Sequence, residues 1–91
     1  MNPVAKHIIF AGQVQGIGFR FTALSVANHY KLTGFVRNLR NGGVEMLAQG
    51  PPDDIDKCVQ EIKKTIGSYV AEVKIDDAAF DPQYKDFKIT F

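Results

Sequence analysis

Residues 12–20 read GQVQGIGFR, and this stretch determines how the rest of the chain is interpreted. It contains three glycines and ends in Arg20, but it has no serine, cysteine, histidine, aspartate or glutamate. Residues 4–11 before it are rich in β-branched and aromatic side chains, which is typical of a strand. After it, apolar side chains recur with the spacing of one helix face, at Phe19, Ala23, Val26 and Tyr30. The stretch is therefore predicted to be a turn that joins a strand to a helix.

A glycine-rich turn at the start of a helix can bind an anion. The first N–H groups of a helix have no partner within the helix, and the helix dipole adds partial positive charge there. Glycines allow successive N–H groups to point inward, and Arg20 would add a planar cation that matches two phosphate oxygens. The turn is neither a Walker motif nor a dinucleotide fingerprint. A tight connection with a surface arginine explains this stretch equally well.

The remaining pattern predicts five further elements. Residues 34–39 and 44–49 are strand-like and flank Asn41-Gly42, which favours a hairpin. A second helix is predicted to open at Pro51-Pro52-Asp53-Asp54 and to end at Gly67. Its apolar stripe consists of Ile55, Cys58, Val59, Ile62 and Ile66. Residues 69–76 alternate as a half-buried strand, with Tyr69, Ala71, Val73 and Ile75 on the apolar face, and residues 87–91 form a short last strand.

This order predicts an α+β fold. The arrangement βαββαβ, with a short extra C-terminal strand, is the ferredoxin-like or split βαβ sandwich. An antiparallel sheet with both helices on one face would bury the two helical stripes. With 91 residues, the chain is expected to form a single domain over 1–91. Many functions occur on this fold, so the fold alone identifies none of them.

Composition narrows the classes of function. The formal net charge is +1, so any anion site must be local, and broad attraction to nucleic acid or membranes is not expected. Cys58 is the single cysteine, which excludes an intrachain disulfide. No apolar run approaches the roughly 18 residues of a membrane span, and the N-terminus does not resemble a signal peptide. A cytoplasmic location is expected.

Two stretches together resemble the acylphosphatase family. They are Gly12-Gln13-Val14-Gln15-Gly16-Ile17-Gly18-Phe19-Arg20 and Gly34-Phe35-Val36-Arg37-Asn38. The resemblance is close over the first half of the chain, and the second half matches in layout more than in residues. Ile17 stands where valine is commoner, and Gly67-Ser68-Tyr69 stands where many members have Gly-Pro.

The resemblance implies hydrolysis of the carboxyl–phosphate bond of acyl phosphates, without metal or cofactor, by a protein expected to be a monomer. It implies that Arg20 and Asn38 are catalytic, with Arg20 on the phosphoryl oxygens and Asn38 holding the attacking water. It also implies a phosphate cradle formed by Gln15, Gly16, Ile17, Gly18, Phe19 and Arg20. From its own stretch alone, Asn38 is more simply a strand-end residue that bonds to a turn.

This chemistry explains why the glycine turn contains no acid or base. The leaving group is a carboxylate, whose conjugate acid has a pKa near ~4, so it departs without protonation. Phosphoryl transfer depends mostly on positioning and charge stabilisation. An amide can orient the water, and the phosphate oxygens of the substrate can accept its proton.

Two other classes of function are alternatives to hydrolysis. Ferredoxin-like sheets also bind RNA, but the expected aromatic pattern is absent from this sequence. A domain that senses an anion without hydrolysing it would keep the cradle but would not need Asn38. The remaining reactive side chains, His7, His29 and Cys58, do not have metal-ligand spacing and are expected to be structural or solvated.

Overall fold

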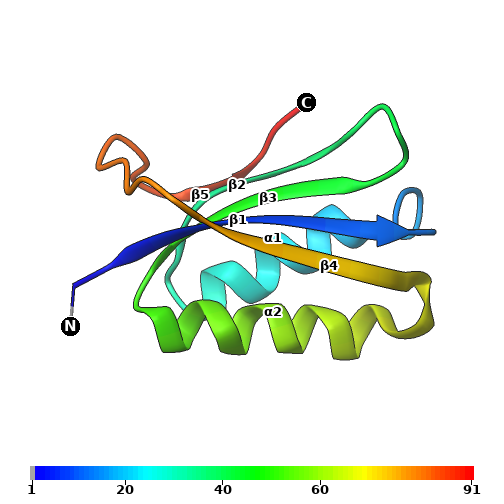
Figure 1. Cartoon of the computed structure of the whole chain (residues 1–91), viewed down its shortest axis with the longest axis horizontal. Helices are drawn as coiled ribbons and strands as arrows, with labels where there is room; N and C mark the ends of the chain where they lie inside the picture. The colour runs from blue at the N-terminus through cyan, green and yellow to red at the C-terminus, as the bar shows by residue number, and fades with distance from the viewer. Residues whose placement is uncertain (1) are drawn as a thin grey trace.

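The computed structural model describes residues 2–91 and confirms the predicted order of elements (Figure 1). The elements are β1 (Val4–Gly12), α1 (Phe19–His29), β2 (Thr33–Asn38), β3 (Val44–Gly50), α2 (Pro52–Ile66), a 3₁₀ turn (Gly67–Tyr69), β4 (Val70–Ala78) and β5 (Phe87–Ile89). Both helices cover one face of the sheet, as the ferredoxin-like fold requires. No helix within residues 2–91 combines the length and the apolar character needed to cross a membrane.

The sheet has the strand order β4-β1-β3-β2-β5. The pairs β4–β1, β1–β3 and β3–β2 are antiparallel, as predicted. β5 differs, because it pairs with β2 in parallel, so the complete sheet is mixed. The segment between β4 and β5 reverses the chain while it passes from one edge of the sheet to the other, and β5 therefore runs in the direction of β2.

The hydrophobic core lies between the sheet and the helices. The predicted stripe of α2 is entirely buried, and so are Phe19, Ala23 and Val26 of α1. Tyr30 is only partly buried and donates a hydrogen bond to Glu61. The rings of Phe10 and Phe19 lie 4.8 Å apart and join β1 to the first turn of α1. This contact fixes the start of α1 against the sheet.

The face assignment predicted for β4 was wrong at its beginning. Val70 packs against the core, whereas Tyr69 is 50% exposed. A bulge explains the change: Gly12 pairs with Val70 while Ala11 pairs with Glu72, so Ala71 is an extra residue on β4. An extra residue reverses which side chains face the core.

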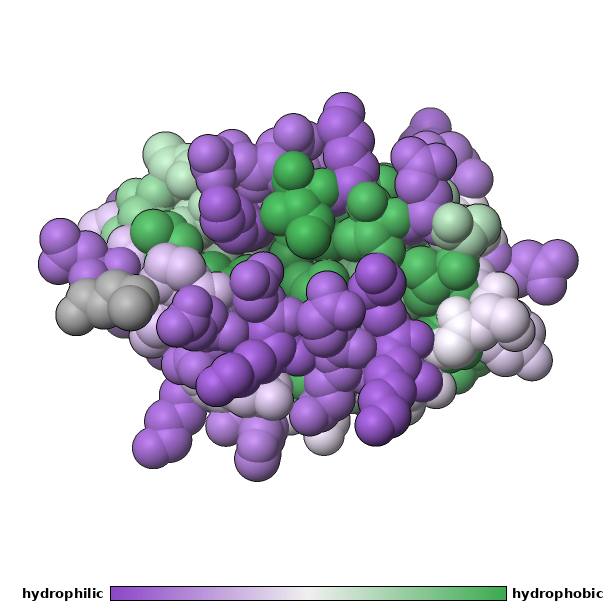
Figure 2. Space-filling model, turned by 60° about the horizontal axis from the view of Figure 1, so that its bottom comes forward, coloured by the Kyte–Doolittle hydropathy of each residue, from purple (hydrophilic) through white to green (hydrophobic). Residues whose placement is uncertain are grey.

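The edge position of β4 leaves apolar side chains exposed. Ile75 retains 45% of its accessible surface because β4 has only β1 beside it. On the side of the molecule that carries α2 and β4, hydrophobic side chains form a strip next to hydrophilic ones (Figure 2).

Gln49 is the buried polar residue of β3, with 1% exposure. Its side-chain amide donates to the Asp81 carbonyl and to Thr33 Oγ1, and it accepts a hydrogen bond from the Asp81 N–H. Because Gln49 lies on the sheet face that the helices leave open, these bonds hold the β4–β5 segment across that face. The alternation of the sequence gave no sign of this anchor.

Gly34 allows β2 to approach β3 closely. Its φ is +133°, and a Cβ at this position would lie 1.9 Å from the carbonyl oxygen of Leu47. No side chain fits such a separation, and positive φ adds backbone strain for other residues. Gly34 therefore sets the position of the strand that ends at Asn38.

We expect Gly34→Ala to lower the free energy of unfolding by at least about 3 kcal/mol, because it combines strain with overlap against backbone. Gly42→Ala is a matched control, since Gly42 also has positive φ but has open space around it. The control should lose only about 1 kcal/mol. Urea unfolding of both variants tests the difference, and equal losses would refute the close-approach argument.

Candidate functional site

A small cavity of about 100 Å³ lies where the β1–α1 loop, the first turn of α1 and the end of β2 meet. It is lined by Val14, Gly16, Gly18, Phe19, Arg20, Phe21 and Asn38. Five of these residues were predicted from the sequence to form the site: Gly16, Gly18, Phe19 and Arg20 from the loop and helix start, and Asn38 from a separate strand. Since one water occupies about 30 Å³ of liquid, the cavity has room for a group of a few heavy atoms.

The loop geometry suits an anion. Gly16 and Gly18 both have φ of +78°, and no other atom lies within 4 Å of where their Cβ atoms would be. Gly18 is the N-cap of α1, and within residues 2–91 no side chain caps this end and no acidic residue occupies the first turn. The N–H groups at this helix start are therefore open to an external acceptor.

Gln15 joins the β1–α1 loop to the β2–β3 hairpin. Its side-chain amide donates hydrogen bonds to the carbonyl oxygens of Leu39, at 2.7 Å, and Gly43, at 2.9 Å. Both carbonyls belong to the β2–β3 hairpin that follows Asn38. The sequence placed Gln15 in the loop but could not indicate these long-range bonds, and neither Gln15 nor Ile17 lines the cavity.

Asn38 and Arg37 point to opposite faces of the sheet. Asn38 pairs with Val44, which is fully buried, and lines the cavity on the helix side. Arg37 lies on the open face and donates a hydrogen bond to Glu45, which also contacts His7 Nε2 at 2.7 Å. Partial burial raises the pKa of Glu45, but the hydrogen bonds from His7 and Arg37 outweigh burial and hold the pKa below its usual value. This cluster joins β1, β2 and β3 beside Asn38.

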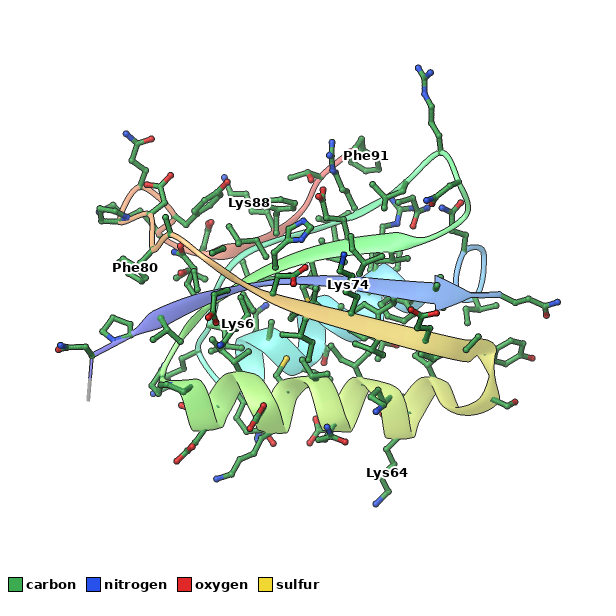
Figure 3. The ribbon with its side chains drawn as sticks, viewed as in Figure 1. Lys6, Lys64, Lys74, Phe80, Lys88 and Phe91 are labelled. Atoms are coloured by element: carbon green, nitrogen blue, oxygen red, sulfur yellow. The ribbon has the colours of Figure 1, made fainter. Side chains whose placement is uncertain are left out.

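Arg20 has an aromatic neighbour that the sequence did not predict. Its guanidinium carbon lies 5.2 Å from the ring centroid of Phe91, within the range of a cation–π contact. Phe91 follows β5 at the end of the chain and is 96% exposed (Figure 3). The sequence left the role of residues 87–91 open, and the parallel pairing of β5 with β2 explains how this ring reaches Arg20.

A larger hollow, of about 470 Å³, lies elsewhere on the molecule. Its lining includes Phe35, Arg37, Tyr84 and Lys88, over β2, β5 and the segment before β5. It contains no helix N-terminus and no glycine turn, and Arg37 is already paired with Glu45. The smaller cavity is therefore the better candidate for an anion site.

The other reactive side chains have structural surroundings. Within residues 2–91, no three histidine, cysteine, aspartate or glutamate side chains lie close enough together to hold a metal ion. His29 packs edge-on against the ring of Tyr30, with the centroids 4.9 Å apart. Cys58 is buried, and burial, with a smaller effect from Glu61, raises its pKa to about 12. Its thiol therefore stays protonated and unreactive at neutral pH.

The chain is similar to known proteins over nearly its whole length. A family model described as acylphosphatase matches residues 6–89. An acylphosphatase from Chlorobaculum tepidum is 38% identical, over 98% of each chain. The crystal structure of acylphosphatase from Bacillus subtilis has a TM-score of 0.89 and 31% identity, covering 97% of this chain and 99% of that one. An acylphosphatase structure from Coxiella burnetii has a TM-score of 0.86 and 31% identity, covering 98% and 94%.

We expect Gln15→Ala to lower the free energy of unfolding by about 2 kcal/mol, because it removes two hydrogen bonds between the loop and the hairpin. Gln13→Ala is the control, since Gln13 is exposed on the same loop, and it should change stability by less than about 0.5 kcal/mol. Hydrogen exchange of the Thr22 amide, which donates to the Gly18 carbonyl at 3.0 Å, should also accelerate in Gln15→Ala alone. Unchanged exchange would show that Gln15 does not hold the loop.

We also expect the Glu45 cluster to make stability depend on pH. Because the pKa of Glu45 is lower in the folded state than in the unfolded state, its stabilisation is present above the unfolded value and is lost as pH falls through the folded value. The difference in Tm between the wild type and Glu45→Gln should therefore be largest near neutral pH and shrink below pH ~4. A difference that does not change with pH would contradict this assignment.

Proposed function

Because this chain belongs to the acylphosphatase family and is a hydrolase of acyl phosphates, we propose that the cavity between the β1–α1 loop and Asn38 is where the reaction occurs. The observation that carries this proposal is the meeting of Arg20, the glycine loop and Asn38 around one small cavity. Arg20 and the glycine loop bind the phosphoryl group, and Asn38 orients the water that attacks it.

The phosphoryl group is held by backbone N–H groups and by Arg20. The N–H groups of residues 15–19 surround the oxygens, supported by the free N-terminal end of α1. Arg20 donates to two oxygens at once with its planar guanidinium. These fixed donors stabilise the charge that develops on the phosphoryl oxygens in the transition state.

The attacking water is oriented by Asn38. The oxygen of water forms a new bond to phosphorus as the bond from phosphorus to the acyl oxygen breaks, and the electron pair leaves with the carboxylate. The water proton passes to a phosphate oxygen of the substrate. An amide can hold the water but cannot remove its proton, and this is sufficient because the transition state is loose.

We further propose the domain organisation, location, oligomeric state and cofactor requirement of the chain. Residues 1–91 form one acylphosphatase-like domain, supported by a family match that spans residues 6–89. The protein is a cytoplasmic monomer that needs no metal or cofactor, and it does not bind nucleic acid. The single cysteine supports the cytoplasmic location, and the net charge of +1 supports the absence of nucleic-acid binding.

Steady-state hydrolysis of benzoyl phosphate, with excess chelator present, tests the roles of the two residues. Arg20→Ala should lower kcat/KM by more than about 10³-fold and weaken inhibition by inorganic phosphate, because it removes charged donors. Asn38→Ala should lower kcat by about 10²-fold while the inhibition constant of phosphate stays within about twofold.

Two variants serve as controls for this experiment. Arg37→Ala removes an arginine from the opposite face of the sheet, and Asn28→Ala removes an exposed amide from α1. Both should keep wild-type kinetics. Wild-type kcat in Asn38→Ala would exclude the water-holding role, and loss of turnover with chelator would exclude the metal-free mechanism.

A further inference from the structure

Phe21 is an exposed aromatic residue at the mouth of the cavity. It retains 70% of its accessible surface and lies in the first turn of α1, next to Arg20. Phe19, two residues earlier, is 2% exposed. A single exposed apolar side chain is common and by itself indicates nothing. Phe21 differs from such residues because it lines a cavity that Arg20 and Asn38 also line.

A groove of about 400 Å³ begins at the same side chain. It runs between α1 and α2 and is lined by Phe21, Thr22, Ser25, Val26 and Thr65. Phe21 is the residue that the groove and the small cavity share. None of the five lining side chains carries a charge, and Val26 supplies an apolar floor. The cavity that suits an anion therefore lies next to a groove that suits an uncharged group, with Phe21 lining both.

The geometry of phosphoryl transfer relates the two hollows. The attacking and leaving oxygens lie roughly in line on opposite sides of phosphorus. Asn38 enters the cavity from the sheet, so the proposed water lies on the sheet side. The groove lies in the other layer, between the helices. A leaving group that departs away from the sheet reaches the groove by passing over Phe21.

We propose that the acyl group of the substrate packs on the ring of Phe21 and extends into this groove, so that the enzyme prefers uncharged, apolar acyl groups, above all aromatic ones. This inference rests on the function proposed above and deepens it by naming the class of acyl group. Phe21 is a specificity-determining residue in this reaction, not a catalytic one. An acyl group with an additional charge would lose water in the groove without gaining a partner there.

The same surroundings favour release of product. When the bond to phosphorus breaks, the acyl group becomes a carboxylate. Neither the ring of Phe21 nor the hydroxyls of Thr22, Ser25 and Thr65 provide a cation to retain it. The groove therefore holds the uncharged acyl group of the substrate, a mixed anhydride, more strongly than it holds the product anion.

The test compares benzoyl phosphate with acetyl phosphate, which share the phosphoryl group and differ in the acyl group. Phe21→Ala should lower the ratio of kcat/KM for benzoyl to acetyl phosphate about 5- to 20-fold, mainly through KM for benzoyl phosphate. Inhibition by inorganic phosphate reports separately on the cradle. Phe80→Ala is the matched control, because Phe80 is also exposed but lies toward the end of the molecule opposite the β1–α1 loop (Figure 3). It should leave the ratio unchanged.

A second variant tests the groove without altering Phe21. Thr65 is exposed on α2, so Thr65→Trp should fold normally and fill the groove. It should also lower the benzoyl-to-acetyl ratio several-fold. Ratios within twofold of wild type in both variants, with both substrates still hydrolysed, would overturn this inference and leave the proposed function standing. If the wild type hydrolyses neither substrate, the proposed function fails and this inference fails with it.

Discussion

The unpaired N–H groups at the start of α1 are the constraint on which the rest of the structure depends. The N–H groups at a helix start have no acceptor within the helix, and here no side chain of residues 2–91 provides a cap. The loop keeps these donors exposed through two glycines in left-handed conformation, and a Cβ at either position would add strain. The neighbouring elements then fix the loop: Phe10 packs on Phe19, and Gln15 bonds to the hairpin. A site made from backbone needs such support because the chain itself is flexible.

Most of the fold could be predicted because its signals are local. Strand alternation, the helical stripes and the Asn41-Gly42 turn each lie within a few residues of one another, and the structure confirms the elements that they predicted. The apolar face at the start of β4 was wrong because a bulge depends on the partner strand. The parallel pairing of β5 was missed for a related reason, since strand direction at an edge follows from the path of the whole chain.

The site could be predicted in part. Its residues were located through two motifs, and the structure brings five of the residues predicted for the cradle and for catalysis to one cavity. The contacts that hold them could not be seen in the sequence. The bonds from Gln15 to Leu39 and Gly43, and the ring of Phe91 against Arg20, join segments that are distant along the chain. The periodicity and spacing of residues in a sequence do not indicate contacts between such distant segments.

The strand order has a consequence for how the site comes into being. The loop follows β1 and Asn38 ends β2, yet these strands are not neighbours, because β3 lies between them. Every residue to which we assign a role on the phosphoryl group or its water lies within residues 15–38, but without β3 nothing pairs with both β1 and β2 to hold them at the correct separation. The site therefore forms only when a later segment inserts into the centre of the sheet, a non-local step of the kind that slows folding. Partly folded chains would not bind phosphate, so a phosphate-containing ligand would stabilise the native state selectively.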